Sequence, residues 1–400
     1  TLSDLKFRAS WGKSGNYNIG DYSSLSLLGN YAYSLGGQLV TGLAPSGIYN
    51  PNLTWEKSNT FDIGVDFGFL NNRITATVDY YDRKSTGLLL NVPVSQITGF
   101  ASSLDNAGSV RNRGWEFEIN SQNITGTTDA FQWSTSFNLS HNSNKLISLP
   151  NGQSQILIPS SFDISHSILR VGDPMYSIYV VRQEGILTQA DIDNGAALYG
   201  NQTEGDPKYF DANGDGIINE NDRVIVGQPN PKFTWGITNT FRYKGFDLSV
   251  LVQGQWGGGT FSLFGRAVNR TGTGIVDNVI GSWRDRWRSP EDPGAGEVGK
   301  TTGTFGRIKN TDWFYPSDYI RVRNITLGYD LGRIIPKTTF KGARIFLTAE
   351  NFFGHDKYDG GFNPEATNTN LSGSTQFPEA GDYGGLPIPK SLIFGLNVTF

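Results

Sequence analysis

The chain has 400 residues, a formal net charge of −4, 37% hydrophobic residues and a mean hydropathy of −0.34. The mild negative charge offers no basic surface for nucleic acid, and the absence of cysteine excludes a disulfide framework and thiolate metal sites. No apolar run reaches the ~20 residues of a membrane-spanning helix, but a membrane-spanning β-strand needs an apolar residue only at every second position. The periodicity of the sequence therefore decides between a soluble and a membrane fold.

Alternation of apolar and polar residues with a period of two recurs along the whole chain, as expected for β-strands with one apolar face. In the first such segment Leu5, Phe7 and Trp11 alternate with Lys6 and Arg8. The segments with this pattern are 5–11, 61–69, 74–81, 115–120, 131–139, 233–241, 246–252, 319–332, 343–349 and 391–400. They predict about ten antiparallel strands of the length that a tilted membrane strand needs.

One of these segments is irregular. In residues 319–332 the apolar positions change phase between Val322 and Ile325. An extra residue in a strand produces such a change, so the sequence predicts a β-bulge near Arg323–Asn324 that re-aims the later side chains.

The connections between the expected strands alternate between short and long. The short ones are 71–72, 125–130, 244–245 and 333–342, and the long ones are about 14–52, 84–108, 143–230, 256–317 and 353–388. Short turns on one side and long loops on the other are typical of outer-membrane barrels, whose short turns are periplasmic. We therefore predict an all-β fold, a transmembrane antiparallel β-barrel with long extracellular loops and a periplasmic C-terminus. A soluble β-sandwich with its apolar faces in a core also fits the alternation alone.

Several stretches, taken together, resemble the barrel of the SusC/RagA-type TonB-dependent transporters of Gram-negative outer membranes. They are "NPNLTWEKSNTFDIGVDFGF" with its continuation to residue 90, "NAGSVRNRGWEFEI" (106–119), residues 211–254 from "DANGDGIINEND" to "LVQG", "SDYIRVRNITLGYDL" (317–331), "ARIFLTAENFF" (343–353) and the terminal "GLNVTF". The resemblance implies a 22-stranded barrel, an N-terminal plug domain and a segment that engages TonB. About ten strands are too few for a barrel of that width. We therefore expect residues 1–400 to be the C-terminal portion of the barrel, with the plug domain outside this chain.

The resemblance also implies a function, the import of oligosaccharides or peptides beneath a SusD-like lipoprotein lid with energy from TonB. Catalysis is not expected, because the sequence has no catalytic motif in a suitable context and His141, His166 and His355 have no metal-ligand spacing. Two alternatives stay open: a SusC-like barrel that acts as a structural subunit of an outer-membrane assembly or secretion complex, and a secreted, calcium-braced carbohydrate-binding β-protein.

The last strand carries bulky apolar residues on one side, Phe394, Leu396, Val398 and Phe400. This pattern resembles the signal that the barrel assembly machinery recognises in outer-membrane proteins. Recognition of a free edge strand uses backbone pairing for affinity and alternate side chains for specificity. We predict that these residues form the assembly signal, and that their outward side contacts membrane lipids.

Residues 211–222, "DANGDGIINEND", contain an EF-hand-like spacing of oxygen donors with glycine at position 6. The predicted donors are Asp211, Asn213, Asp215, the carbonyl of Ile217 and Asp222. Calcium bound there would have a structural role. An Asx-rich turn held by its own side chain to backbone hydrogen bonds explains the same residues without a metal, and both interpretations stay open.

Aromatic residues are frequent in the long loops. We predict that some of them contact the ligand or the lid protein, or form the aromatic girdle at the membrane surface, and we favour the girdle and the protein interface over direct glycan stacking. The candidates are Trp256, Trp283, Trp287, Trp313 and Tyr315.

Overall fold

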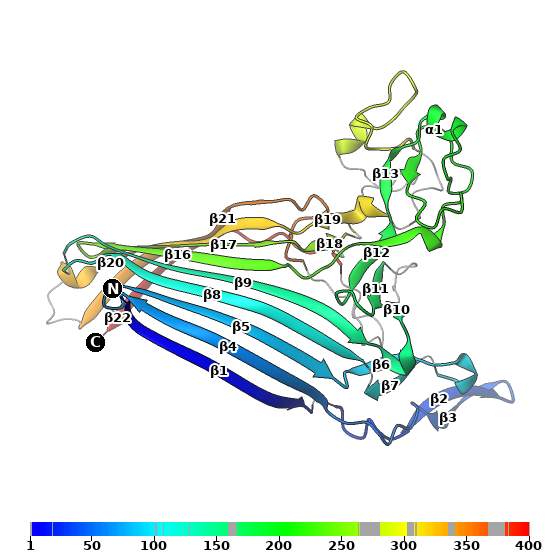
Figure 1. Ribbon diagram of the computed structural model, residues 1–400, viewed down its shortest axis with the longest axis horizontal. Coiled ribbons are helices and arrows are strands. Elements are labelled where there is room, and N and C mark those ends of the chain that lie inside the picture. Colours follow the sequence, from blue (N-terminus) through cyan, green and yellow to red (C-terminus); the bar gives the residue numbers. More distant parts are fainter. Residues whose placement is uncertain are drawn as a thin grey trace.

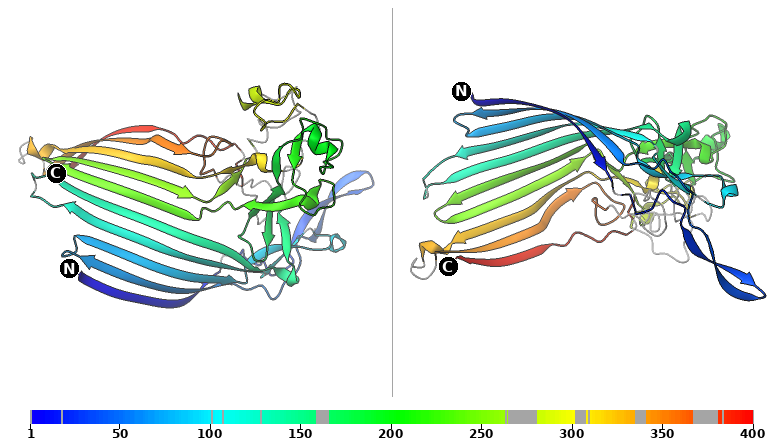
Figure 2. Two further views of the ribbon diagram at one scale, coloured as in Figure 1. Left: turned by 45° about the horizontal axis from the view of Figure 1, so that its top comes forward. Right: turned by 90° about the horizontal axis from the view of Figure 1, so that it is seen from below.

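The computed structural model describes residues 2–17, 19–100, 102–106, 108–127, 129–158, 166–262, 264, 281–301, 308, 310–334, 341–366, 381–382 and 384–399. Its dominant element is a curved sheet of ten long strands (Figures 1 and 2). The strands are β1 (Leu2–Asn16), β4 (Glu56–Phe69), β5 (Ile74–Thr86), β8 (Ser109–Ile124), β9 (Gln132–Ser148), β16 (Phe233–Tyr243), β17 (Phe246–Trp256), β20 (Tyr319–Asp330), β21 (Gly342–Asp356) and β22 (Ser391–Thr399). Each predicted strand corresponds to one of these. No helix among the described residues is long and apolar enough to cross a membrane.

Every strand of the sheet pairs antiparallel with its neighbour along the chain, in the order β1-β4-β5-β8-β9-β16-β17-β20-β21-β22. The short connections, 70–73, 125–131, 244–245 and 331–341, therefore all belong to one end of the sheet, which we call the turn end. The long connections belong to the opposite end, the loop end. Figure 2 shows the N- and C-termini both at the turn end, at opposite edges of the sheet.

The predicted bulge is confirmed. Along β20, Val322 pairs with Val252 of β17, but Asn324 already pairs with the adjacent Leu251, so Arg323 is the extra residue. The pairing of β20 with β21 shifts at the same place. The bulge keeps Ile325 on the same face of the sheet as Val322, because one inserted residue cancels the phase change in the sequence.

The long connections fold into smaller elements beyond the loop end, which together we call the loop body (Figure 1). They include a four-stranded sheet of β10 (Gln155–Ile158), β11 (Ser167–Arg170), β12 (Ser177–Val181) and β15 (Arg223–Gly227). Four two-stranded ribbons are β2 (Leu28–Leu35) with β3 (Gln38–Pro45), β6 (Leu89–Pro93) with β7 (Ser102–Asn106), β13 (Gln183–Ile186) with β14 (Pro207–Tyr209), and β18 (Gly259–Phe261) with β19 (Phe314–Pro316). The described helices are α1 (Gln189–Asp193) and the 3₁₀ turns Gln96–Thr98, Pro150–Gly152, Glu220–Asp222, Gly281–Asp285, Thr311–Trp313 and Leu331–Arg333.

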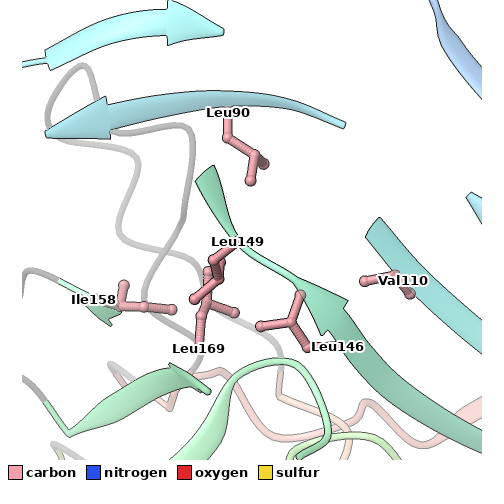
Figure 3. Packing of buried hydrophobic residues seen from close by; sticks show 6 residues of the cluster. All are labelled: Leu90, Val110, Leu146, Leu149, Ile158 and Leu169. Atoms are coloured by element: carbon pink, nitrogen blue, oxygen red, sulfur yellow. The ribbon is translucent and has the colours of Figure 1, made fainter. Parts of the chain in front are cut away.

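The buried apolar clusters belong to the loop body and to the adjoining strand ends. Figure 3 shows one of them, in which Leu146 and Val110 from the ends of β9 and β8 meet Leu149, Ile158 and Leu169. A second cluster packs Ile178 and Val180 of β12 against Phe261 and Trp313. Buried apolar contacts therefore stabilise the loop body. The large sheet extends away from these contacts.

One face of the large sheet is apolar from edge to edge. The register aligns Phe7, Val65, Val78, Phe117 and Leu139 in one row across β1 to β9. A second row aligns Phe241, Leu248, Leu327, Leu347 and Phe394 across β16 to β22. None of these side chains is buried, so the described part of the chain provides no second layer over this face.

The opposite face is polar, and glycine residues let its charged groups meet across an intervening strand. Arg8 and Asp79 lie on β1 and β5, with Gly64 of β4 between them in the same row. The Arg8 guanidinium donates to Asp66 at 2.9 Å and to Asp79 at 3.1 Å. A Cβ atom at position 64 would lie 2.0 Å from the Asp79 carboxylate, so only glycine leaves room for this contact.

The same arrangement recurs elsewhere on the polar face. Arg344 of β21 reaches Asp247 of β17 at 2.5 and 3.0 Å over Gly328 of β20. Tyr81 donates to Asn142 at 3.0 Å over Gly114. Gly64, Gly114 and Gly328 thus have a packing role, since each admits a polar contact between two strands that are not neighbours.

We expect Gly64→Ala to lower the free energy of unfolding by about 1–3 kcal/mol, because the new methyl group overpacks the contact between Arg8 and Asp79. Gly12→Ala on β1 is the matched control, since a Cβ there meets no atom within 4 Å. Reversible unfolding of the full-length protein in detergent measures both variants. Equal stability of the two would contradict the proposed role of Gly64.

Candidate functional site

Aromatic side chains gather at both ends of the apolar face. At the loop end Trp115, His141 and Phe233 cluster with ring centroids 4.7–6.2 Å apart, and the ring of Trp235 lies 5.5 Å from that of Trp256. Two such clusters with an apolar band between them match the aromatic girdles of a transmembrane β-barrel.

At the turn end, Trp133 and Phe131 stack on Phe241, and Phe246 lies 4.4 Å from Tyr329. Phe246 and Trp256 belong to the two girdles on the same strand, β17, and are ten residues apart, which corresponds to about 34 Å along that strand and, with the usual strand tilt, to about 25 Å along the membrane normal. This spacing fits the apolar band of an outer-membrane barrel, which is about 25 Å tall.

Charged side chains on the polar face converge at its loop end around Glu365, which belongs to the connection after β21. The Glu365 carboxylate accepts hydrogen bonds from Tyr319 at 2.7 Å and Arg321 at 3.0 Å, and it also contacts Arg323. Arg321 is buried, and Arg323 is the extra residue of the bulge. The bulge therefore turns a second guanidinium toward the carboxylate that Arg321 already binds.

A cleft of about 210 Å³ adjoins this cluster. Its walls come from segments far apart in the sequence, 229–231, 259–261 and 364–366, together with Gln255 and Ser317. Gln255 lies on the polar face and donates to the Ser317 carbonyl at 3.0 Å. The cleft and the Glu365 cluster together form a candidate binding site at the loop end of the polar face.

The loop 211–222 is held by its own backbone donors. Asp211 accepts hydrogen bonds from the backbone N–H groups of Gly214 at 2.7 Å and Gly216 at 2.8 Å, and these bonds lower the pKa of the Asp211 carboxyl. Both oxygens of the buried Asp222 carboxylate accept backbone N–H groups, from Ala212 at 3.0 Å and Asn219 at 2.8 Å. These hydrogen bonds form the Asx-rich turn, which is one of the two interpretations that the sequence allows for this loop.

The predicted calcium donors do not form one cage. Asp215 accepts from the backbone of Ile217, and the side chain of Asn213 donates to Asp215 at 3.0 Å. Within the described residues no group of three His, Asp or Glu side chains is placed to bind a metal ion. Both oxygens of Asp222 accept backbone N–H groups, and calcium binding stays a prediction from the sequence alone.

The five candidate aromatic residues do not share one surface. Trp256 lies on the apolar face in the loop-end girdle. Trp313 and Trp283 are buried, with exposed fractions of 1% and 6%, so they are core residues of the loop body and not exposed contact residues. Trp287 packs over Gly205, and Tyr315 lies edge-to-face against Tyr358 at 5.8 Å.

The last strand places Phe394, Leu396 and Val398 on the apolar face, with Phe394 72% exposed. Phe400 lies outside the described residues. In the described sheet β22 pairs only with β21, so its other edge is open to a further strand. This geometry is compatible with an assembly signal, which remains a prediction.

The sequence analysis did not identify the Glu365 cluster. Its members come from β20 and from a loop 42–46 residues further along the chain, and the loop has no periodicity that would indicate a contact. The one available signal was the predicted bulge, since a bulge often re-aims a side chain beside a functional site.

The geometry defines the class of protein as a segment of an outer-membrane-type β-barrel, with an apolar band between two girdles and a polar inner face. Residues 2–352 match the family model described as TonB dependent receptor-like, beta-barrel. The chain therefore belongs to the TonB-dependent receptor β-barrel family, as the resemblance predicted, and it is of the SusC/RagA type. Members of this family reside in the outer membrane.

The chain is 32% identical over 409 residues to TonB-dependent receptor P3 of Formosa agariphila. This alignment covers 100% of the chain and 40% of that protein. It is 32% identical over 375 residues to TonB-dependent receptor SusC of Bacteroides thetaiotaomicron, covering 90% of the chain and 35% of that protein. The RagAB peptide transporter structure superposes with a TM-score of 0.80 at 24% identity, over 100% of this chain and 41% of that one. The chain thus spans 40% or less of the length of these curated relatives.

We expect Asp222→Ala to loosen the 211–222 loop even without calcium, because two backbone N–H groups lose their acceptor at a cost of about 1–3 kcal/mol. Hydrogen exchange of the full-length protein in a calcium chelator measures the opening of the loop. The control is Asp215→Asn, which is exposed and retains an oxygen for the Ile217 N–H group. A wild-type loop that exchanges freely in chelator and is protected only by calcium would contradict this account.

Proposed function

We propose that the protein containing this chain is a TonB-dependent importer of oligosaccharides or peptides in the outer membrane. The chain would supply ten strands of the barrel wall. The remaining strands, the plug domain and the TonB-engaging segment would come from the rest of the protein. The likeness to a structure described as a peptide transporter supports the peptide class. The oligosaccharide class rests on the resemblance of the sequence to the SusC/RagA-type transporters.

The observation that carries this proposal is the contrast between the two faces of the sheet. The apolar rows have no protein layer over them in the described part of the chain, whereas the opposite face carries charged pairs such as Arg8 with Asp66. A soluble sandwich would bury the apolar face against a second sheet. A barrel wall needs lipid on one side and a wet pore on the other.

The orientation follows from the connections. We place the turn end, with both chain ends, in the periplasm and the loop body outside the cell, because outer-membrane barrels have short periplasmic turns. The open edges of β1 and β22 would pair with strands of the remaining barrel, since an unpaired edge in lipid leaves backbone groups unsatisfied. The barrel assembly machinery would recognise β22 before that closure.

The transport function requires no bond-making step. The loop body and the cleft beside Glu365 would receive the solute, and the polar face would line its path once TonB moves the plug. The family consists of receptors and transporters, and no described residue is assigned to catalysis.

The hairpin β2–β3 supports a lipoprotein lid as partner. Residues 22–55 contain no charged side chain, and Leu28, Tyr31, Leu39 and Leu43 of the hairpin are 51–80% exposed. Figure 1 shows the hairpin projecting beyond the loop end. An isolated two-stranded ribbon is marginally stable in water, and exposed apolar patches mark protein interfaces. We propose that a SusD-like lipoprotein covers it.

Import is tested by gene deletion with complementation. We expect deletion to abolish growth on one class of large glycan or peptide, and the wild-type gene to restore it. A gene that carries Glu365→Ala should restore growth only in part, with uptake about tenfold lower than wild type. The reason is that the loop loses the charged hydrogen bonds that anchor it to β20. Glu291→Ala, an exposed loop carboxylate, is the control. Undiminished growth on all such nutrients, with stable attachment to another membrane assembly, would contradict import and favour the scaffold alternative.

The lid is tested by a charge placed on the hairpin. We expect Leu39→Asp with Leu43→Asp to reduce recovery of the lipoprotein with the affinity-purified full-length receptor by tenfold or more, since each buried carboxylate lacks a partner. The control is Leu70→Asp with Ile334→Asp, two exposed apolar residues at the turn end. Equal recovery with both pairs, at equal receptor levels, would exclude the hairpin as the lid interface.

A further inference from the structure

Six basic side chains occupy the apolar face of the sheet beyond the loop-end girdle. They are Lys13, Lys57, Lys84, Arg111, Arg113 and Lys145, and we call them the basic rim. Four of them fall in a single cross-strand row, in which Lys13 pairs with Asn59, Asn59 with Lys84, Lys84 with Arg111 and Arg111 with Lys145. The rim therefore runs across five consecutive strands, from β1 to β9.

The rim lies on the same face as the apolar band. Lys13 follows Trp11 by two residues, and Arg113 precedes Trp115 by two residues, so each lies on the same side of its strand as the neighbouring girdle aromatic. The row next to that of Lys13 and Lys84 holds Trp11 opposite Phe61. The rim thus continues the outward surface of the barrel and does not face the pore.

The charge of the rim is largely uncompensated. Among the described residues of these five strands, the acidic side chain beside the rim on the outward face is that of Asp82, which pairs with Arg113 at 3.0 Å and also with Arg111. The four lysines are exposed, and none of them has a carboxylate partner among the described residues. Four lysine charges therefore remain available to a ligand outside the chain.

The depth of the rim corresponds to the lipid headgroup layer. Two residues along a strand cover about 7 Å, which with the usual strand tilt is about 5 Å along the membrane normal. Aromatic girdles lie at the headgroup boundary, so side chains one step further out lie among the lipid phosphates. Clusters of Lys and Arg at this level attract anionic lipids with about 1 kcal/mol for each charge.

We propose that the basic rim binds the phosphate groups of anionic lipids in the leaflet on the loop side of the membrane. The four exposed lysines act as flexible point charges for the phosphates, whereas Asp82 holds the guanidinium groups of Arg111 and Arg113. Since the rim covers β1 to β9, such lipids would collect along this side of the barrel. The inference rests on the membrane placement proposed above.

The experiment compares lipid binding to the full-length detergent-purified protein by native mass spectrometry, with phosphatidylglycerol as the anionic probe and phosphatidylcholine as the neutral one. The test variant is Lys13→Gln with Lys84→Gln. Lys6→Gln with Arg83→Gln is the matched control, because these residues lie on the same two strands, β1 and β5, but on the polar face.

We expect the wild-type protein to bind phosphatidylglycerol about fivefold or more tightly than phosphatidylcholine. The test variant should lose about five- to thirtyfold in phosphatidylglycerol affinity and keep its phosphatidylcholine affinity. The control should stay within about twofold of wild type for both lipids, since its charges face the pore.

Three results would overturn the inference: unchanged phosphatidylglycerol affinity in the test variant, an equal loss in the control, or an equal loss for both lipids. Loss of a co-purifying protein with lipid affinity unchanged would assign the rim to a protein partner, which also overturns it. Outer-membrane placement and nutrient uptake are measured separately. Normal uptake without phosphatidylglycerol selectivity therefore refutes this inference and leaves the proposed function standing.

Discussion

The structure depends on one constraint, the register of ten antiparallel strands. Because successive side chains of a strand point to opposite faces, a slip of one residue would exchange the apolar and polar sets of that strand. The observed register instead keeps bulky residues such as Phe117 and Leu248 in continuous outward rows. Lipid cannot hydrogen bond to the backbone, so a wall facing it must pair its strands completely and present mainly apolar groups.

The polar face follows from the same register. Glycine at selected inward positions removes a side chain and lets charged groups two strands apart form ion pairs, as Arg8 and Asp79 do over Gly64. These pairs stiffen the wall while they leave it hydrophilic. At the loop end the bulge at Arg323 adds a further charge, which draws Glu365 from an external loop onto the wall. Barrel wall and loop body are thereby connected beside the cleft.

The sequence predicted the sheet well because strand periodicity is a local property that repeats ten times. The bulge was predictable for the same reason, since one inserted residue visibly changes the phase. The loop body was not predictable in this way. Trp313 and Trp283 were candidates for contacts with a ligand, a lid protein or the membrane surface, but they are buried, because the folding of long loops onto one another depends on contacts that no periodicity records. The Asx turn at Asp222 was one of two interpretations that the spacing of oxygen donors left open.

The central claim is that lipid contacts the apolar face of the sheet. It is tested most directly by spin labels on single cysteines at positions 76 to 81 of β5 in the full-length reconstituted protein without other cysteines. The account predicts that labels replacing Ala76, Val78 and Tyr80 collide with oxygen dissolved in the bilayer, whereas labels replacing Thr77, Asp79 and Tyr81 collide with a water-soluble nickel complex. Labels at Ala76 and Val78 that reach neither reagent would show a protein layer over this face and would contradict the account.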